Sequence, residues 1–199
     1  MTQTVHFADG KLKDVPLVVT VGVFDGLHIG HMALIRKCVE LSHELNAKSM
    51  VVSFSVNPKM FCRTQESCPD LLSREKFLNI LNNTGVNYNC VIDFSRNISK
   101  LTGEEFIAKI CTLYNLKAMV VGENFKCGNP ADCAGPMQIS RFLSQYTSDA
   151  VLAVVPPVTL YGEAVSSSRI RRCLLTGDLE TASSLLGRPL NLQESQNVC

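Results

Sequence analysis

Segments of nearly continuous apolar residues alternate along the chain with segments whose apolar residues recur at helical spacing. The run at 17–23 (LVVTVGV) is short and rich in β-branched residues, which is typical of a strand buried on both faces of a parallel sheet. Apolar residues then recur at helical spacing from His31 to Leu45, and the segment at 48–55 (KSMVVSFS) is strand-like again. Together these three segments predict one βαβ unit.

The same alternation continues to about residue 186. Ser73 and the tetrapeptide TGEE at 102–105 are helix-start signals, and the second of them is a capping box. This regular alternation predicts an α/β fold with an open parallel sheet, right-handed crossovers and helices on both faces. The expected elements are strands at 17–23, 48–55, 89–94, 118–122 and 151–155, helices at 31–45, 73–81, 102–114 and 137–146, an extended piece at 158–165, and two short helices that end near Leu186.

Composition narrows the class of protein. A chain of 199 residues with 46% hydrophobic and 19% charged residues is typical of one globular domain and excludes disordered and collagen-like proteins. The net charge of +1 attracts neither nucleic acid nor anionic membranes, so a bound phosphate needs a local site. The chain contains no apolar stretch of membrane-spanning length and no apolar segment behind a basic N-terminus, which predicts a cytoplasmic protein.

Nine cysteines are scattered along the chain without a CxxC pair, so we expect reduced thiols and no protein metal site. The gap between Cys62 and Cys68 equals the gap between Cys127 and Cys133. This repeated spacing leaves a metal or disulfide pair open as an alternative.

The loop that follows the first predicted strand, GVFDGLHIGH at 22–31, is the first candidate site, because ligands of open α/β sheets bind beyond the carboxyl ends of the strands. His28 and His31 lie where free backbone N–H groups and a helix dipole favour anions, and Gly30 allows a phosphate to approach the backbone. The loop therefore suits a polyphosphate. Zinc is the alternative ligand, but no third ligand lies nearby and the HExxH pattern is absent.

Two further loops carry groups that suit a nucleotide. The segment at 166–172 (SSSRIRR) places three hydroxyls and three guanidiniums at a predicted helix start, where they can donate hydrogen bonds to anionic oxygens. An ordinary capped basic helix has the same pattern. The segment at 122–128 (GENFKCG) follows a strand, and its Asn124 and Phe125 can hydrogen-bond and pack a base or a flavin ring, unless it is an ordinary turn.

These three loops, together with the segment at 174–190 (LLTGDLETASSLLGRPL), resemble the adenylyltransferase module of bacterial FAD synthetases, the bifunctional riboflavin kinase/FMN adenylyltransferase family. GVFDGLHIGH is similar to the family's first nucleotidyltransferase signature, GENFKCG to its G-E-[DN]-F-x-F-G segment, and VSSSRIR to its I-S-S-T-x-I-R signature. The four motifs occur in family order over about residues 17–190. The resemblance implies a Rossmann-like nucleotidyltransferase fold and the reaction ATP + FMN → FAD + pyrophosphate with Mg²⁺.

The resemblance also implies roles for individual residues. Five residues are expected to be catalytic. His28 and His31 would bind and polarise the ATP phosphates. Ser167, Ser168 and Arg171 would hold the β- and γ-phosphates of the leaving pyrophosphate. These five and six more would bind ATP: Gly22, Phe24, Asp25, Gly26, Gly30 and Asn124. The expected flavin-binding residues are Phe54, Asn57, Pro58, Phe61, Asn124, Phe125 and Cys127. With a reference pKa near 6.5, the two imidazoles are expected as either cationic or neutral donors, and anionic neighbours would favour the charged form.

Three positions depart from the family pattern. Ser168 stands for threonine, which is conservative, whereas Asn57 replaces a titratable histidine and Cys127 trades the aromatic surface of a phenylalanine for a thiol. FMN affinity is the property that the last two changes affect. The alternatives are therefore an adenylyl- or cytidylyltransferase for another phosphate ester, and a catalytically weak relative that binds flavin or nucleotide.

The domain organisation follows from the same resemblance. One nucleotidyltransferase domain is expected at 1–190, with a short tail at 191–199. A riboflavin kinase module follows the LGRP segment in the bifunctional proteins, and here only nine residues follow Leu190, so we expect no kinase domain. The expected partners are ATP and FMN, and a separate riboflavin kinase that supplies FMN, with no nucleic acid and no membrane.

Overall fold

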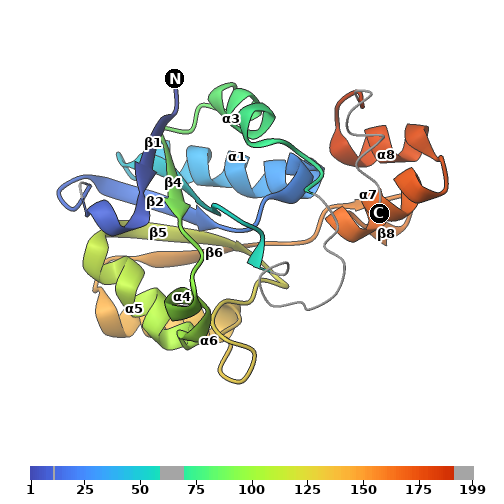
Figure 1. Cartoon of the computed structure of the whole chain (residues 1–199). Coiled ribbons are helices and arrows are strands. Elements are labelled where there is room, and N and C mark those ends of the chain that lie inside the picture. Colours follow the sequence, from blue (N-terminus) through green and yellow to red (C-terminus); the bar gives the residue numbers. More distant parts are fainter. Residues whose placement is uncertain (11, 59–69, 191–199) are drawn as a thin grey trace.

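The computed structural model describes residues 1–10, 12–58 and 70–190 of the chain (Figure 1). Six parallel strands form one sheet in the order β1-β4-β3-β2-β5-β6. These strands are β1 (Gln3–His6), β2 (Pro16–Val21), β3 (Lys48–Phe54), β4 (Tyr88–Ile92), β5 (Asn115–Gly122) and β6 (Val151–Val155). A separate antiparallel hairpin consists of β7 (Thr159–Leu160) and β8 (Glu163–Ala164). The predicted open parallel sheet is thus confirmed.

Helices connect the strands and follow the last of them. The α-helices are α1 (Ile29–Glu44), α3 (Arg74–Asn82), α4 (Arg96–Lys100), α5 (Gly103–Leu113), α6 (Pro136–Tyr146), α7 (Ser167–Leu175) and α8 (Leu179–Leu186). Two 3₁₀ turns, η1 (Phe7–Asp9) and η2 (Asp25–Leu27), follow β1 and β2. No helix within the described part of the chain has the length and apolarity that crossing a membrane requires.

The helix starts are those that side-chain chemistry predicts. Ser73 accepts a hydrogen bond from the Lys76 N–H at the start of α3. At α5 the capping box is complete, because Thr102 Oγ1 accepts from the Glu105 N–H while Glu105 Oε2 accepts from the Thr102 N–H. Each such bond satisfies a backbone donor that the helix itself leaves free.

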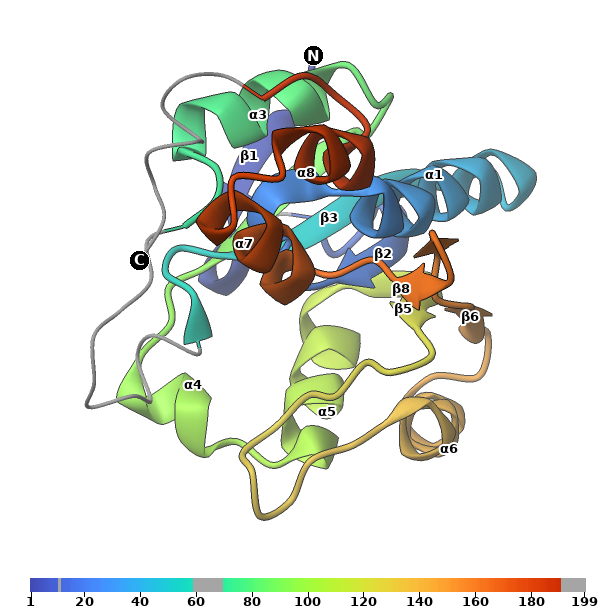
Figure 2. The same cartoon turned by 90° about the vertical axis from the view of Figure 1, so that its right-hand side faces the viewer.

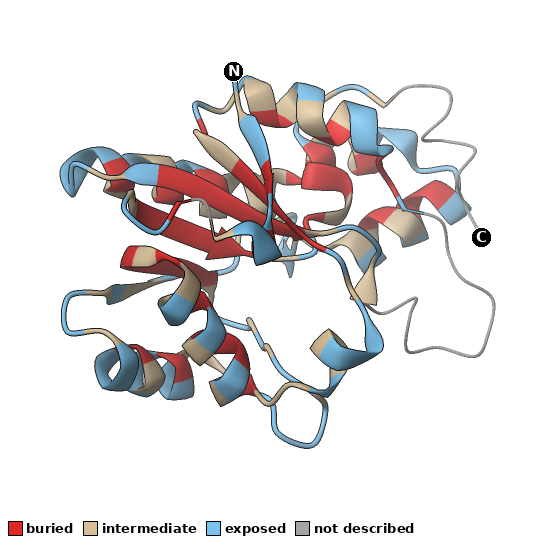
Figure 3. Ribbon diagram, turned by 60° about the vertical axis from the view of Figure 1, so that its left-hand side comes forward, coloured by how far each residue is buried: buried red, intermediate tan, exposed pale blue. Residues whose placement is uncertain are grey.

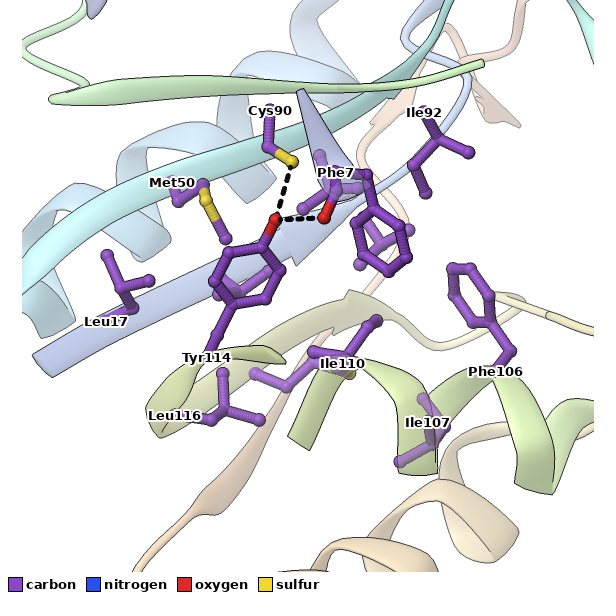
Figure 4. Packing of buried hydrophobic residues seen from close by; sticks show 14 of the residues in the cluster. Phe7, Leu17, Met50, Cys90, Ile92, Phe106, Ile107, Ile110, Tyr114 and Leu116 are labelled. Carbon is purple, nitrogen blue, oxygen red and sulfur yellow. Dashed lines mark hydrogen bonds between the residues drawn. The ribbon is translucent and has the colours of Figure 1, made fainter. Parts of the chain in front are cut away.

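Helices cover both faces of the sheet, with α1 and α3 on one face and α5 and α6 on the other (Figures 1 and 2). The central strands are buried on both sides, as their continuous apolar runs predict, whereas the edge strands β1 and β6 are more exposed (Figure 3). On the α5 face, the Tyr114 hydroxyl donates to the Phe7 carbonyl over 3.0 Å and lies 3.3 Å from Cys90 Sγ (Figure 4). This contact joins the first residues of the chain to the main core.

Strand order decides where a ligand can bind. The chain runs outward from β2 through β3 to β4, then returns to place β5 on the other side of β2 and continues to β6. The loops after β2 and β5 therefore leave the sheet at neighbouring positions on opposite sides of a topological switch point. In open α/β sheets, the crevice beyond the carboxyl ends at this point is the usual ligand site.

The sequence pattern did not reveal strand β1 or helix α4, and it predicted the β7–β8 hairpin only as an extended piece. Strand β1 pairs with β4 at the sheet edge, and its residues QTVH bury only Val5, so no strand pattern is visible. Helix α4 spans only five residues and has none buried. The extended piece at 158–165 proves to be the hairpin β7–β8, whose turn holds Tyr161 and Gly162 at positive φ.

Candidate active site

One large cavity of about 1080 Å³ lies at the carboxyl end of the sheet. Residues at or just beyond the ends of β2, β3, β4, β5 and β6 line it, together with the start of α7. The first, second and third loops that the sequence singled out, at 22–31, 166–172 and 122–128, thus meet around one space. Segments more than 140 residues apart in the chain contribute to it.

The two histidines of the first loop form a stacked pair at the start of α1. His28 is the N-cap residue, and its Nδ1 accepts a hydrogen bond from the His31 N–H over 3.2 Å. The two rings stack with their centroids 3.6 Å apart, and the Phe24 ring meets His31 edge-on at 5.4 Å. Because Nδ1 of His28 is an acceptor, the proton of the neutral ring lies on Nε2. A Cβ at Gly30 would lie 3.2 Å from the His28 ring, so this glycine makes room for the imidazole.

Burial determines the charge of both imidazoles. Desolvation lowers the pKa of His28 to about 4, although the negative charge of Asp25 opposes this change. Desolvation and the neighbouring His28 hold the pKa of His31 well below its usual value. The anionic neighbour Asp25 thus favours the charged form of His28, as expected, but desolvation outweighs it. Of the two forms that the sequence left open, the neutral one is present in both rings at neutral pH.

Asp25 connects the first loop to two other segments. Its Oδ2 lies 2.7 Å from Arg171 Nη1 in an ion pair whose side chains are 7% and 18% exposed, respectively. Its Oδ1 accepts a hydrogen bond from the Leu71 N–H over 2.8 Å, and its carbonyl accepts one from Ser167 Oγ over 2.9 Å. Asp25 therefore fixes the position of the Arg171 guanidinium before any ligand is present.

The three arginines of α7 fall into two groups. Arg171 lines the cavity and pairs with Asp25, whereas Arg169 donates to the Leu160 and Glu163 carbonyls and also pairs with the Glu163 carboxylate. Arg172 lines the cavity and lies 3.0 Å from Glu163 Oε2. Arg169 thus ties the β7–β8 hairpin to α7, while Arg171 and Arg172 face the cavity, where Ser167 and Ser168 add hydroxyls in the first turn of the helix.

The opposite wall of the cavity is apolar. It comes from the α4 and α5 side of the sheet and from the ends of β3 and β4, where the Phe54 and Phe94 rings meet edge-on at 5.7 Å. The side chains of this wall are Phe54, Phe94, Ile98, Leu101, Phe106, Phe125 and Cys127. Such a surface suits a flat aromatic ring, while the histidine and arginine side suits phosphates.

The third loop shows how Cys127 differs from an aromatic residue. A backbone bridge between Cys127 and Ala134 holds it, with the two N–H···O bonds 3.1 and 2.8 Å long. Burial, with Cys133 nearby, raises the pKa of the Cys127 thiol to about 12, so the thiol is protonated at neutral pH. Cys127 is a small neutral part of the apolar wall. The described cysteines are free, as expected, so the alternative of a disulfide between Cys127 and Cys133 is wrong.

Most of the predicted site residues line the cavity. They are Gly22, Phe24, Asp25, His28, Gly30, His31, Phe54, Asn57, Pro58, Asn124, Phe125, Cys127, Ser167, Ser168 and Arg171. Gly26 does not line it, because this buried residue turns toward Leu71 and Leu186, and a Cβ there would lie 3.1 Å from Leu71 Cδ1. Phe61, Cys62 and Cys68 lie outside the described residues.

Sequence reasoning missed part of the apolar wall. Phe94 is the last residue of the predicted strand at 89–94, so the rule that directs attention to strand ends could have found it. Ile98 and Leu101 belong to or follow α4, whose short polar sequence gives no signal. Asp70 is a further polar neighbour: burial and the Asp25 charge raise its pKa, while a hydrogen bond with Asn57 lowers it.

The described residues hold no cluster of three or more metal-ligating side chains. The carboxylates that line the cavity are Asp25 and Glu123, and Asp25 is already bound to Arg171 and to the Leu71 N–H. This donor set does not fit a resident metal ion. A magnesium ion that enters with phosphates takes most of its ligands from phosphate oxygens and water, which the cavity admits.

Comparisons with known proteins agree with this geometry. A sequence model described as FAD synthetase matches residues 11–169. A FAD synthetase of Listeria monocytogenes is 30% identical over 176 residues, which cover 86% of this chain and 69% of that protein. A bifunctional riboflavin kinase/FMN adenylyltransferase of Buchnera aphidicola is 26% identical over 87% of this chain, which spans only 55% of that protein. The chain thus covers about half the length of such bifunctional relatives.

Solved structures share the fold. A Streptococcus pneumoniae structure described as a macrolide-efflux protein superposes with a TM-score of 0.81 and 29% identity, over 94% of this chain and 60% of that one. Pantothenate synthetase from Thermus thermophilus superposes with a TM-score of 0.57 and 19% identity, over 93% of this chain and 71% of that one. The second likeness concerns the fold alone.

Proposed function

This chain is a member of the FAD synthetase family, and on that premise we propose that it transfers the adenylyl group of ATP to FMN, giving FAD and pyrophosphate. The observation that carries the proposal is the two-sided cavity. Neutral imidazoles, hydroxyls and guanidiniums gather on one wall, and aromatic and aliphatic side chains on the other. The joining of a flavin phosphate to a nucleotide needs both walls at once.

The proposed reaction is an in-line displacement. An oxygen of the FMN phosphate forms a bond to the α-phosphorus of ATP, the bond from that phosphorus to the bridging oxygen breaks, and pyrophosphate leaves with the electron pair. The attacking phosphate is already ionised at neutral pH, so no general base is required. The protein contributes by positioning the two phosphates and by stabilising the charge that develops between them.

The structure supports specific roles in this reaction. The His28 Nε2–H is a neutral donor whose orientation is fixed by the bond that its Nδ1 accepts, so it can donate to a phosphate oxygen without reorganisation. His31, stacked beneath it, is the second imidazole. Arg171 with Ser167 and Ser168 at the start of α7 would hold the β- and γ-phosphates, where the helix dipole adds positive potential.

The flavin is proposed to lie against the apolar wall. Phe54, Phe125 and Cys127 contribute to this wall, and Phe94 adds a second aromatic ring beside Phe54. Asn57 and Pro58 border the same cavity, and Asn57 bonds to Asp70 on its polar side. Asn124 is exposed in the loop that follows β5, lines the cavity, and would contact the nucleotide or the flavin.

The remaining parts of the proposal concern the surroundings of the reaction. Magnesium would act as the counter-ion of ATP, with no resident site in the protein. We propose one nucleotidyltransferase domain at 1–190, a cytoplasmic location, and a separate riboflavin kinase as the source of FMN. The free state of the described cysteines is compatible with a reducing compartment.

The test is to incubate the purified chain with ATP, Mg²⁺ and either FMN or riboflavin, and to separate the flavins by chromatography. FAD from FMN, but not from riboflavin, is expected. A preparation with His28→Ala and His31→Ala together controls for host enzymes. Pyrophosphate release with another phosphate ester, but not with FMN, would assign the chain to a different acceptor, and FMN binding without FAD would make it a binding relative.

A further inference from the structure

We propose that Arg188 is a positioning residue, whose guanidinium holds the turn at Gly26 and thereby the orientation of His28 toward the cavity. Arg188 lies just after α8, does not line the cavity, and is not among the residues that the sequence motifs single out as catalytic. It would act on the reaction only through the first loop. The inference rests on the proposed function for its consequence in catalysis, but its structural content can be tested separately.

The turn that carries His28 has a backbone that needs outside support. Phe24 and Leu27 are non-glycine residues at φ 53° and 43°, and Gly26 between them is at φ 83°. Left-handed conformations of non-glycine residues are strained and persist where the surroundings fix them. The turn ends at His28, the N-cap of α1, so a change in the turn changes where the His28 ring points.

Arg188 supplies part of that support. Its Nη2 donates to the Gly26 carbonyl over 3.1 Å, in the middle of the left-handed stretch. The Arg188 backbone is itself fixed, because its carbonyl accepts a hydrogen bond from Ser183 Oγ over 2.8 Å. The guanidinium therefore bridges a rigid helix end and the carbonyl of a turn that is strained by itself.

The approach of the two segments is close enough to need a glycine. Gly187 lies at φ 68° as the C-cap of α8, and a Cβ there would come within 2.5 Å of Ile29 Cγ2 at the start of α1. Gly187, the residue before Arg188, thus packs closely against Ile29, the residue after His28. Asp25 secures the same turn from the other side through Arg171, Ser167 and Leu71. The consecutive loop residues Asp25 and Gly26 are therefore held by groups from different elements.

The experiment compares Arg188→Met, Arg188→Gln and Arg188→Lys with the unchanged chain, using two readouts. The first is kcat and the KM for ATP in the FAD-forming reaction. The second is the ¹⁵N chemical shifts of the His28 imidazole, which report whether Nδ1 still accepts the His31 N–H, independently of activity. Arg141→Met, on the exposed side of α6 and away from the cavity, is the matched control.

Arg188→Met is expected to lower kcat by about tenfold or more, because small displacements of positioned groups reduce rates steeply, with KM for ATP changed less. The His28 signals should move toward those of a ring without the Nδ1 hydrogen bond. Arg188→Lys should restore part of both readouts and Arg188→Gln less, because the glutamine amide ends two bonds short of Nη2. If Arg188→Met does not fold, the proposal is tested by whether Arg188→Lys retains more of kcat and of the original His28 signals than Arg188→Gln does.

Unchanged His28 signals in Arg188→Met, or in Arg188→Gln should the first not fold, would overturn the proposal whatever happens to kcat. Equal effects of Arg141→Met would overturn it as well. If the unchanged chain makes no FAD while Arg188→Met still shifts the His28 signals, the positioning role stands and the proposed reaction fails. The two proposals are therefore distinguishable.

Discussion

His28 and His31 show how packing changes the chemistry of a residue. In water each imidazole would be partly charged near neutral pH, but here burial and mutual contact make both neutral. A neutral ring with one fixed donor is suited to stabilise a developing phosphate charge, because it needs no reorganisation when that charge forms. The hydrogen bond from the His31 N–H to His28 Nδ1 is what fixes that donor.

Replacing His31 by alanine is predicted to lower kcat by about 100-fold or more, the usual effect of removing a donor that acts in the transition state. The KM for ATP should change by much less, because Arg171 and the α7 N-terminus remain. Steady-state kinetics of FAD formation measure both values. His43→Ala, on the exposed last turn of α1, should leave them unchanged, and an unaltered kcat in His31→Ala would remove His31 from catalysis.

The pH dependence of stability should carry the signature of His28. Its pKa is about 4 in the folded chain and near 6.5 when unfolded, so the unfolded chain binds the proton more readily. The resulting loss of folding stability is absent above about pH 6.5 and grows as the pH falls toward 4. The free energy of unfolding should therefore be lower at pH 5 than at pH 7 by about 2 kcal/mol.

Urea unfolding at several pH values measures this effect. His28→Asn keeps an N-cap acceptor but removes the titrating ring, so its stability should fall less between pH 7 and pH 5 than that of the unchanged chain. Parallel curves for the two proteins would contradict the low pKa of His28. An NMR titration of the imidazole gives the pKa directly.

At the scale of elements, helix starts place the site. The caps of α1, α5 and α7 set where these helices begin, and each of these helices contributes to the cavity wall. For α7, Ser166 accepts from the Arg169 N–H, which leaves Ser167 free to bond Asp25 and Ser168 to face the cavity. The three adjacent serines therefore differ in their contacts: Ser166 caps the helix, Ser167 bonds the Asp25 carbonyl, and Ser168 faces the cavity.

Removal of the capping box of α5 tests the importance of such a start. Thr102→Ala is predicted to lower the free energy of unfolding by about 1 kcal/mol, because the Glu105 N–H loses its acceptor. Thr112→Ala on the same helix, where the exposed hydroxyl bonds only the Ala108 carbonyl, should cost less than about 0.5 kcal/mol. Urea denaturation measures both, and equal losses would show that the cap is not what stabilises the helix.

At the scale of the molecule, α7 and α8 form a separate hydrophobic cluster beside the sheet. Its core includes Ile170, Leu174, Leu185 and Leu186, with Leu71 as the contribution from the rest of the chain. Polar contacts of Asp25 and Gly26 connect this helix pair to the first loop. The histidine and arginine side of the cavity thus depends on the contact between this helix pair and the first loop. Figure 2 shows α7 and α8 packed together beside the sheet.

Asp25→Asn should therefore loosen the helix pair relative to the sheet. We expect amide hydrogen exchange in α7 to become roughly tenfold faster while exchange in β2 and β5 stays the same, because local opening has its own free energy. Mass spectrometry of exchanged peptides measures this. Glu163→Gln is the control, since it removes a carboxylate that pairs with arginines of α7 without reaching the first loop. Equal exchange in both variants would argue against a dependence on this contact.

The sequence by itself determined the α/β class, the central strands, the main helices with their caps, and the three loops of the site. These features depend on local signals: continuous apolar runs, helical spacing, and side chains that satisfy the first N–H groups of a helix. The motifs of the three loops, together with the segment at 174–190, also indicated the family. Strand β1 and helix α4 escaped because their few residues are mostly exposed and carry no period.

Only the tertiary structure decided the charge of the histidines, the pairing of Asp25 with Arg171, the apolar wall with Phe94 and Ile98, and the contact of Arg188 with Gly26. Each of these depends on groups far apart in the chain. The pKa of a ring depends on how much water surrounds it, and the sequence around an arginine gives no sign of whether its guanidinium faces the cavity. Local sequence patterns therefore determine the helices and strands, whereas contacts between residues far apart in the chain determine the charge and the partners of the side chains in the site.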